Sequence, residues 1–250
     1  MKVFPVTTKI SIGFLGLGQM GAPMAERLLR PDIALHVFDL RPNAMAPFVA
    51  RGAEACTSPA MVAKKASIIF ACLPTAQVSE AVAAEVAASG GPQIYAEMST
   101  IGRQAMERIA EVLAPRGIGC VDAPISGGPA GARAGTLAML SAGSPNAVAA
   151  LRPWQLCIGR EVFVLGDKPG QAQVMKLVNN LLFATNLAAA CEAFAMGAKA
   201  GLDADVMLAM VNAVTGRSMV TERVMEEVLS GAFRFGASTA VMDKDTQLGV

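Results

Sequence analysis

A glycine-rich turn between an apolar run and a helical pattern constrains this chain more than any other feature. The apolar run 10–15 is followed by Gly16, Gly18 and Gly21, and residues 22–29 then have the pattern of a helix. In such a turn the first glycine permits a tight bend, the second lets the backbone approach a pyrophosphate, and the third lets the helix pack on the strand. The N–H groups at the start of the helix attract phosphate. The context therefore predicts a dinucleotide-binding turn.

An acidic residue stands where a second strand is expected to end. The apolar run 35–38 leads into Asp39, eighteen residues after Gly21. A carboxylate at this place accepts hydrogen bonds from the hydroxyls of an adenosine ribose and repels a 2′-phosphate, so Asp39 favours NAD over NADP. Arg41 lies two residues further on and could pair with that phosphate, which keeps NADP open. The alternative interpretation is a solvated aspartate after an incidental turn.

Composition and charge exclude several classes of function. The 250 residues are 53% hydrophobic and 16% charged with a net charge of +1, which favours a globular protein with a large core. We see no block of like charges and no uninterrupted apolar segment of membrane-spanning length, so we expect neither a nucleic-acid nor a membrane partner. Five scattered cysteines are typical of reduced thiols in a cytoplasmic protein. His36 is the single histidine and no Cys-x-x-Cys pair occurs, so no metal site is expected.

The order of apolar runs and helical patterns predicts the fold class. Strand-like runs alternate with helical patterns at 10–15, 35–38, 68–73, 94–98, 119–123, 137–141 and 162–165. This alternation is typical of an α/β protein with a Rossmann-type, doubly wound, mainly parallel sheet. Beyond that region the patterns are helical, at 171–200, 204–214 and 221–229. We therefore predict an NAD(P)-binding Rossmann domain at 9–168 and an all-helical domain for substrate binding and dimerisation at 169–250.

Lysine is the best candidate for a proton donor and acceptor beside a nicotinamide. His36 lies in the second predicted strand, and Tyr95 is not followed by the lysine of a Tyr-x-x-x-Lys pair. Lys176 lies early in the long helical pattern, and Asn180 shares its helix face. Burial beside an apolar nicotinamide would lower the pKa of such a lysine and help it to accept a proton. From the spacing alone, a surface lysine with a hydrogen-bonded asparagine is the favoured interpretation.

Two further groups of residues follow predicted strands. In the segment 122–128, successive N–H groups at Ser126, Gly127 and Gly128 could hold a carboxylate, although a plain glycine turn is an equal alternative. The pairs Ser99-Thr100 and Leu73-Pro74 follow two other strands, at the edge where open sheets bind ligands. Their alternative role is to cap or turn the chain at the start of a helix.

These motifs, taken together, resemble the β-hydroxyacid dehydrogenase family, which includes 3-hydroxyisobutyrate dehydrogenases and tartronate semialdehyde (2-hydroxy-3-oxopropionate) reductases. The resemblance extends from about residue 9 to the last residue. In chain order it is carried by the glycine turn at 16–25, Leu73-Pro74, Ser99-Thr100, the segment 122–128, the block from Gly170 through Lys176 to Asn180, and Lys244-Asp245.

The resemblance implies hydride transfer between NAD or NADP and a small 3-hydroxy acid or its semialdehyde. Lys176 is implied to be the catalytic acid and base, and Ser126, Gly127, Gly128 and Asn180 to bind the carboxylate substrate. It also implies a homodimer or homotetramer. The residues that it implies for cofactor binding are Gly16, Gly18, Gln19, Met20, Gly21, Asp39, Leu73, Pro74, Ser99, Thr100 and Lys244.

Two alternatives stay open. An imine reductase on the same scaffold would usually replace Lys176 with another proton donor. A non-catalytic NAD-binding or assembly module is suggested by the end of the sequence at Val250, where family members normally continue for several helices, so we expect the helical domain to be incomplete. A 6-phosphogluconate dehydrogenase-like enzyme shares the glycine turn and a similar lysine, but it needs a larger helical domain.

Overall fold

The computed structural model describes residues 9–234 and 238–249, which form two compact units. The first unit ends at Lys176 and the second begins at Leu177. This division follows compactness alone, so the domain limits 9–168 and 169–250 stay a prediction. Each unit is described by itself below.

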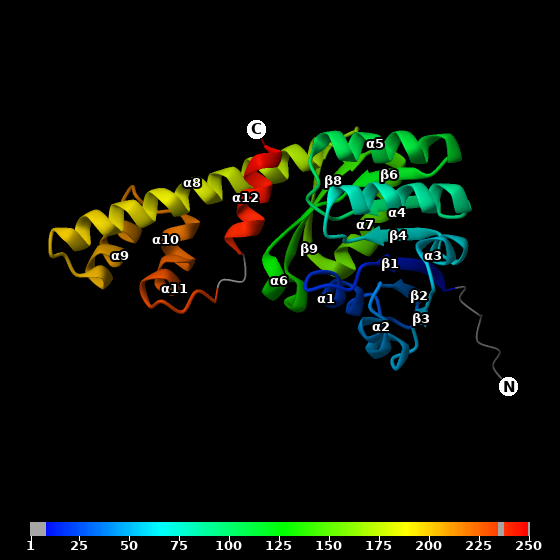
Figure 1. Ribbon diagram of the computed structural model, residues 1–250, viewed down its shortest axis with the longest axis horizontal. Coiled ribbons are helices and arrows are strands. Elements are labelled where there is room, and N and C mark those ends of the chain that lie inside the picture. The colour runs from blue at the N-terminus through cyan, green and yellow to red at the C-terminus, as the bar shows by residue number, and fades with distance from the viewer. Residues whose placement is uncertain (1–8, 235–237, 250) are drawn as a thin grey trace. The chain divides into compact units, whose positions relative to one another are not determined.

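The first unit is built on one mainly parallel sheet (Figure 1). Its parallel part consists, in spatial order, of β3 (Glu54–Ala55), β2 (Ile33–Phe38), β1 (Ile10–Leu15), β4 (Ile68–Ala71), β5 (Ile94–Glu97) and β6 (Gly119–Asp122). The strand β8 (Leu137–Gly143) follows β6 in the sheet. It pairs antiparallel with β6 and β7 (Ile125–Ser126) and parallel with β9 (Gly159–Gly166). The predicted Rossmann-type sheet is confirmed, and the two-residue strands β3 and β7 are additions to it.

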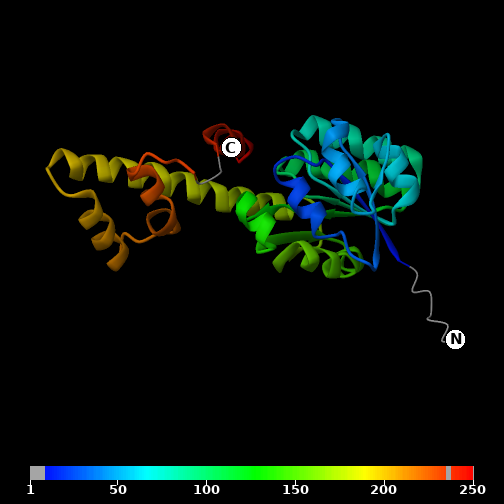
Figure 2. The ribbon, with the colours of Figure 1, turned by 90° about the horizontal axis from the view of Figure 1, so that it is seen from below.

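Helices cover both faces of this sheet (Figures 1 and 2). One face packs on α1 (Gly21–Glu26), α2 (Pro42–Val49), α6 (Gly128–Ala134) and α7 (Pro145–Ile158), and the other on α3 (Pro59–Lys65), α4 (Ala76–Ser89) and α5 (Arg103–Leu113). The 3-10 turn η1 (Ala114–Arg116) follows α5. Successive strand side chains serve opposite faces, as Phe70 and Ile69 of β4 show, because the side-chain period of a strand is two. Both faces are buried, which is why the strands are almost continuously apolar.

The second unit is helical. The helix α8 (Gln171–Lys199) begins in the first unit and continues into the second, where α9 (Ala204–Ala213), α10 (Met219–Arg223), α11 (Met225–Leu229) and α12 (Thr239–Leu248) follow. A small core forms around Phe194, Val220 and Met225. The single helix expected at 221–229 is wrong: the chain forms α10 and α11, which are separated at Val224, whose φ of −115° departs from helical values.

The helix α8 is more apolar than the sequence analysis allowed for. By length and composition it could cross a membrane, with an 18-residue window of mean hydropathy 1.4, and only 11% of that window is buried. Polar residues such as Asn179 and Asn180 interrupt its apolar runs without adding charge, so no uninterrupted apolar segment reveals this helix in the sequence. Large apolar side chains on its exposed surface include Val178, Leu181, Leu182 and Met196.

Candidate active site

The glycine turn has the geometry that a bound pyrophosphate needs. Gly16 has a φ of +91°, and a Cβ there would lie 2.2 Å from the Cys72 carbonyl oxygen. A Cβ on Gly21 would lie 1.9 Å from the Gly16 carbonyl oxygen. A Cβ on Gly18 would meet no atom within 4 Å among the described residues, so this side of the turn is open to a ligand. The turn therefore fits a dinucleotide, with Gln19 exposed and Met20 half-buried beside the opening.

Asp39 connects the end of β2 to the glycine turn. Its Oδ2 accepts a hydrogen bond of 2.8 Å from the backbone N–H of Leu17. Its Oδ1 accepts from the backbone N–H of Arg41 at 2.8 Å and from Arg41 Nε at 3.0 Å. Burial opposes the ionisation of Asp39, but these bonds outweigh it and hold the pKa of the carboxyl below its ordinary value. A charged carboxylate thus stands beside the turn.

The loops after β4 and β5 meet next to this turn. The backbone N–H of Leu73 donates to Ser99 Oγ across 2.7 Å, and Leu73 also lies against Gly16. Pro74 follows Leu73, and Thr100 follows Ser99, at the carboxyl ends of their strands. The structure therefore brings the predicted cofactor-binding residues of three neighbouring strands to one edge of the sheet. That edge is where open α/β sheets bind their ligands.

A buried glutamate supports the loop after β5. Glu97 Oε1 accepts a hydrogen bond of 3.0 Å from the Ser99 backbone N–H, and Oε2 accepts one of 3.3 Å from the Tyr95 hydroxyl. Burial raises the pKa of Glu97 to about 7. No role was predicted for Glu97, although an acid inside an otherwise apolar strand is a visible signal.

A second buried group connects the start of α8 to the sheet. Asp122 Oδ2 accepts from the backbone N–H groups of Gly170 and Gln173, both at 2.9 Å. The side-chain amide of Gln173 donates to Asp122 Oδ1 at 2.8 Å and to the Ser99 carbonyl oxygen at 3.1 Å. Burial raises the pKa of Asp122 to about 6. The contact between Asp122 and Gln173 was not predicted, because nothing in the sequence pattern distinguishes Gln173 from an exposed glutamine.

The predicted carboxylate nest lies between β7 and α6. Ser126 is paired with Ala138 of β8, Gly127 has a φ of +130°, and Gly128 has a φ of +62°. Both glycines adopt backbone conformations that other residues rarely take. A Cβ on Gly128 would meet no atom within 4 Å in the described part of the chain, so space remains beside its backbone.

The remaining predicted site residues lie on α8 and α12. Lys176 is half-buried and is the last residue of the first unit. In the second unit, Asn180 Nδ2 donates to Asp245 Oδ2 at 2.7 Å, and Lys244 Nζ pairs with Asp245 Oδ1 at 2.9 Å. Asp245 is 4% exposed. No role was predicted for Asp245, although it stands next to Lys244 in the sequence.

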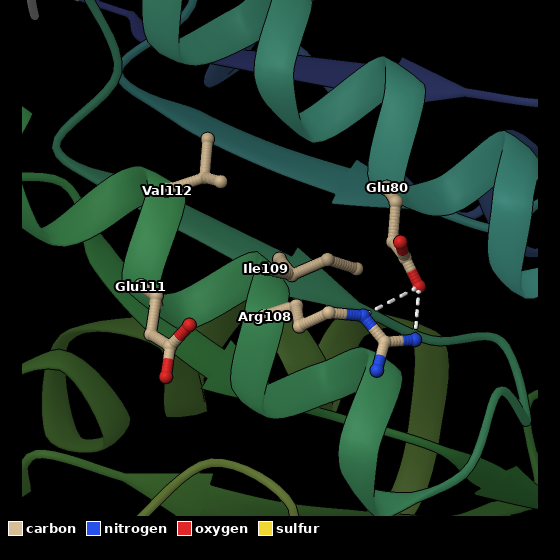
Figure 3. A pocket seen from close by; sticks show the side chains of 5 residues that line it. All are labelled: Glu80, Arg108, Ile109, Glu111 and Val112. Atoms are coloured by element: carbon tan, nitrogen blue, oxygen red, sulfur yellow. Dashed lines mark hydrogen bonds and ion pairs between the residues drawn. The ribbon is translucent and has the colours of Figure 1, made fainter.

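A hollow between α4 and α5 lies apart from these residues. Figure 3 shows it lined by Glu80, Arg108, Ile109, Glu111 and Val112. Arg108 donates to Glu80 Oε1 from Nη2 at 2.7 Å and from Nε at 3.3 Å. This is an exposed ion pair between two helices, and it is not part of the candidate site.

Two family models cover nearly the whole described chain. Residues 11–166 match the NAD-binding domain of 6-phosphogluconate dehydrogenase. Residues 170–250 match the domain described as NAD-binding of NADP-dependent 3-hydroxyisobutyrate dehydrogenase. The chain belongs to the β-hydroxyacid dehydrogenase family. As a member of that family it is an NAD(P)-dependent oxidoreductase of hydroxy acids, which confirms the predicted family, enzyme class and cofactor.

Individual relatives agree with this family. The chain is 37% identical to the 2-(hydroxymethyl)glutarate dehydrogenase of Eubacterium barkeri, over 96% of this chain and 81% of the relative. It is similar to a Mycobacterium tuberculosis 3-hydroxyisobutyrate dehydrogenase solved with L-serine, with a TM-score of 0.89, 29% identity, and coverage of 96% and 85%. It shares its fold with an imine reductase of Streptomyces aurantiacus, with a TM-score of 0.71, 19% identity, and coverage of 95% and 92%.

Proposed function

We propose that this enzyme transfers a hydride between NAD and a small 3-hydroxy acid or its semialdehyde, with Lys176 as general acid and base. Candidates are 3-hydroxyisobutyrate and the product of 2-hydroxy-3-oxopropionate reduction. The main supporting observation is that hydrogen bonds join the first turn of the Lys176 helix to one edge of the sheet. The glycine turn and the loops after β4 and β5 meet at that edge. A bound nicotinamide supplies the hydride acceptor or donor.

The chain's own residues account for the rest of the reaction. When the alcohol is oxidised, neutral Lys176 Nζ would take the hydroxyl proton, and a bound nicotinamide would accept the C–H hydride. The C–O bond becomes a carbonyl, so electrons and protons balance, and the reverse step reduces the semialdehyde. The N–H groups of the nest formed by Ser126, Gly127 and Gly128 are proposed to hold the carboxylate, with Asn180 oriented toward the reacting oxygen.

Asp39 supports the choice of NAD over NADP. Its carboxylate is charged and stands at the turn, so it can accept the ribose hydroxyl hydrogens and repel a 2′-phosphate. Arg41 is engaged with the same carboxylate in the described structure. We therefore propose NAD as the preferred cofactor.

The test is nicotinamide absorbance at 340 nm with a panel of 3-hydroxy acids and semialdehydes. We expect turnover with NAD, and a loss of at least about a hundredfold in kcat for Lys176→Ala with NAD binding retained. Lys199→Ala, an exposed lysine at the end of the same helix, is the matched control. Unchanged turnover in Lys176→Ala would overturn the mechanism. NAD binding without any turnover would favour the non-catalytic module, and turnover of cyclic imines alone would favour the imine reductase.

We also propose that the protein forms a homodimer or homotetramer in the cytoplasm. The exposed apolar side chains of α8 and α9, such as Leu182, Met196, Val206 and Met210, form more apolar surface than isolated surface residues supply. A second copy presents the same surface, as a two-fold interface requires. Light scattering after size-exclusion chromatography tests this, with Leu182→Glu expected to give monomers. A wild-type monomer that binds lipid vesicles would instead indicate that α8 meets a membrane.

A further inference from the structure

Three segments of the first unit meet at two buried side chains. Asp122 ends β6, Gln173 lies in the first turn of α8, and the loop after β5 passes both of them. Gln173 Oε1 accepts from the backbone N–H groups of Ile101 at 2.9 Å and Gly102 at 3.1 Å. Its Nε2 donates to the Ser99 carbonyl oxygen and to Asp122 Oδ1. Both side chains have no exposed surface.

This junction is complete in hydrogen-bonding terms. The two acceptor sites and the two N–H groups of the Gln173 amide all have partners. Asp122 Oδ2 accepts from the N–H groups of Gly170 and Gln173, which stand at the start of α8 and have no partner within the helix. A buried network of this kind rigidifies the segments that it joins when every member is satisfied.

The junction also lies next to the proposed chemistry. Lys176 follows Gln173 by three residues on α8, so the two side chains share a helix face. The same glutamine amide binds the Ser99 carbonyl, and Ser99 belongs to the proposed cofactor loop. Any shift of this amide therefore moves the base of the Lys176 helix against the loop after β5.

We propose that Asp122 and Gln173 are positioning residues, which hold the Lys176 helix and the loop after β5 in the one arrangement that permits proton transfer. This inference rests on the proposed function. Neither residue touches the reacting atoms, so each acts through Lys176 and through the cofactor loop.

Charge around the junction is mixed. Glu97 faces Asp122 from β5, Cys120 lies on β6 itself, and Arg103 and Glu107 of α5 lie beside Gly170. Burial raises the pKa of Asp122, so a neutral amide is the natural replacement for this carboxylate. The carboxylate at position 122 and the amide at position 173 can therefore be exchanged by mutation.

The experiment is a double-mutant cycle with Asp122→Asn, Gln173→Glu and the double variant. In Asp122→Asn, the new N–H₂ group faces donors in either orientation, namely the Gln173 amide or the backbone N–H groups of Gly170 and Gln173. In Gln173→Glu, two carboxylate oxygens face each other. In the double variant the amide of residue 122 can donate to the carboxylate of residue 173, although the Ser99 carbonyl loses its donor. Gln171→Glu makes the same chemical change at an exposed glutamine of the same helix and is the control.

We expect each single variant to lose about ten- to a hundredfold in kcat, because a small misplacement of a catalytic group is costly. The Kd for NAD should stay within about threefold, and the kcat–pH profile should shift. The double variant should recover at least about threefold over the weaker single variant and restore the profile. Circular dichroism at the assay temperature confirms that the variants are folded, and Gln173→Met replaces any single variant that is not.

Folded single variants that keep kcat within about threefold, or a double variant whose loss equals the product of the single losses, would overturn the positioning role. Failure of the proposed function has a different appearance. It is seen as a wild-type enzyme without turnover, or as unchanged turnover in Lys176→Ala. The positioning role is judged only in an enzyme that Lys176→Ala inactivates, so the two failures are separate.

Discussion

Asn180 donates its side-chain amide to Asp245 Oδ2 across 2.7 Å, and the other oxygen of the same carboxylate is paired with Lys244 at 2.9 Å. Asp245 is almost completely buried, whereas Lys244 is half-exposed. One carboxylate thus orients two residues that were predicted to contact substrate and cofactor.

Asp245→Asn should therefore weaken substrate binding more than it slows chemistry. The amide keeps the shape of the carboxylate but loses the charge that holds Lys244, and it has a single acceptor oxygen where the carboxylate has one for Asn180 and one for Lys244. A lost hydrogen bond to a charged group costs about 1.5 kcal/mol or more, so we expect KM for the hydroxy acid to rise about tenfold with kcat changed less. Initial rates at saturating NAD measure this. Asp243→Asn on the exposed side of α12 is the control, and an equal effect there would contradict the assignment.

Two substitutions in the glycine turn should differ in their effects, because one should lower the stability of the fold and the other the affinity for NAD. Gly21→Ala should destabilise the fold by about 1–3 kcal/mol, because its Cβ would overlap the Gly16 carbonyl oxygen. Gly18→Ala should leave the melting temperature nearly unchanged, since its Cβ meets open space, but should weaken NAD binding at least tenfold by occupying the pyrophosphate position. Thermal melts and NAD titration distinguish the two. Tight NAD binding by folded Gly18→Ala would show that the pyrophosphate lies elsewhere.

Asp39→Ser should change the coenzyme preference. Removing the carboxylate removes the repulsion of a 2′-phosphate and frees Arg41 to bind one, so kcat/KM with NADP should rise and that with NAD should fall about tenfold. Asp32→Asn, a surface carboxylate paired with Arg30, is the matched control. The measurement is the ratio of kcat/KM for the two coenzymes, and an unchanged ratio would remove Asp39 from the cofactor site.

Glu97 makes stability depend on pH in a direction that can be tested. Its pKa rises from 4.5 to about 7 in the folded protein because the side chain is buried. The folded state therefore keeps a proton that the unfolded chain has lost. The stability from this group is fully present below pH 4.5 and is lost as the pH rises through about 7.

Glu97→Gln should remove this dependence. At pH 5 the variant and the wild type should have similar free energies of unfolding, and at pH 8 the variant should be more stable by about 1–3 kcal/mol. Asp122 contributes in the same direction in both proteins, so it cancels in the difference. Urea unfolding at the two pH values is the measurement, with Glu111→Gln as the surface control. A difference that does not change with pH would show that Glu97 is charged throughout.

The sequence predicted those parts of the fold that repeat a strong pattern. Strands β1, β2, β4 and β5 are mainly apolar runs, and α8 was placed within one residue of its observed end. The short strands β3 and β7 were missed because two residues carry no period. The break at Val224 was missed because its apolar neighbours continue the helical pattern.

In the candidate site, too, local motifs were visible in the sequence and long-range contacts were not. Gly16, Gly18, Gly21 and Asp39 were visible because the turn is local in sequence and each glycine has a steric reason. The contact between Gln173 and Asp122 joins residues 51 positions apart, and only the folded sheet brings them together. The functional roles of all the predicted site residues, the glycines and Asp39 as well as Lys176, Ser126 and Asn180, stay predictions, which the proposed measurements test.

Asp39 has a further consequence through its bond to the Leu17 N–H. The side chain proposed to discriminate between the two coenzymes is therefore also a structural support of the glycine turn, which is proposed to bind the pyrophosphate that both coenzymes share. Replacing Asp39 would therefore also remove a hydrogen bond from the glycine turn, so the gain with NADP should be smaller than relief of the charge repulsion alone would give. A descendant that adopted the phosphorylated coenzyme would need a compensating change near Leu17, so the two sites should evolve as a pair.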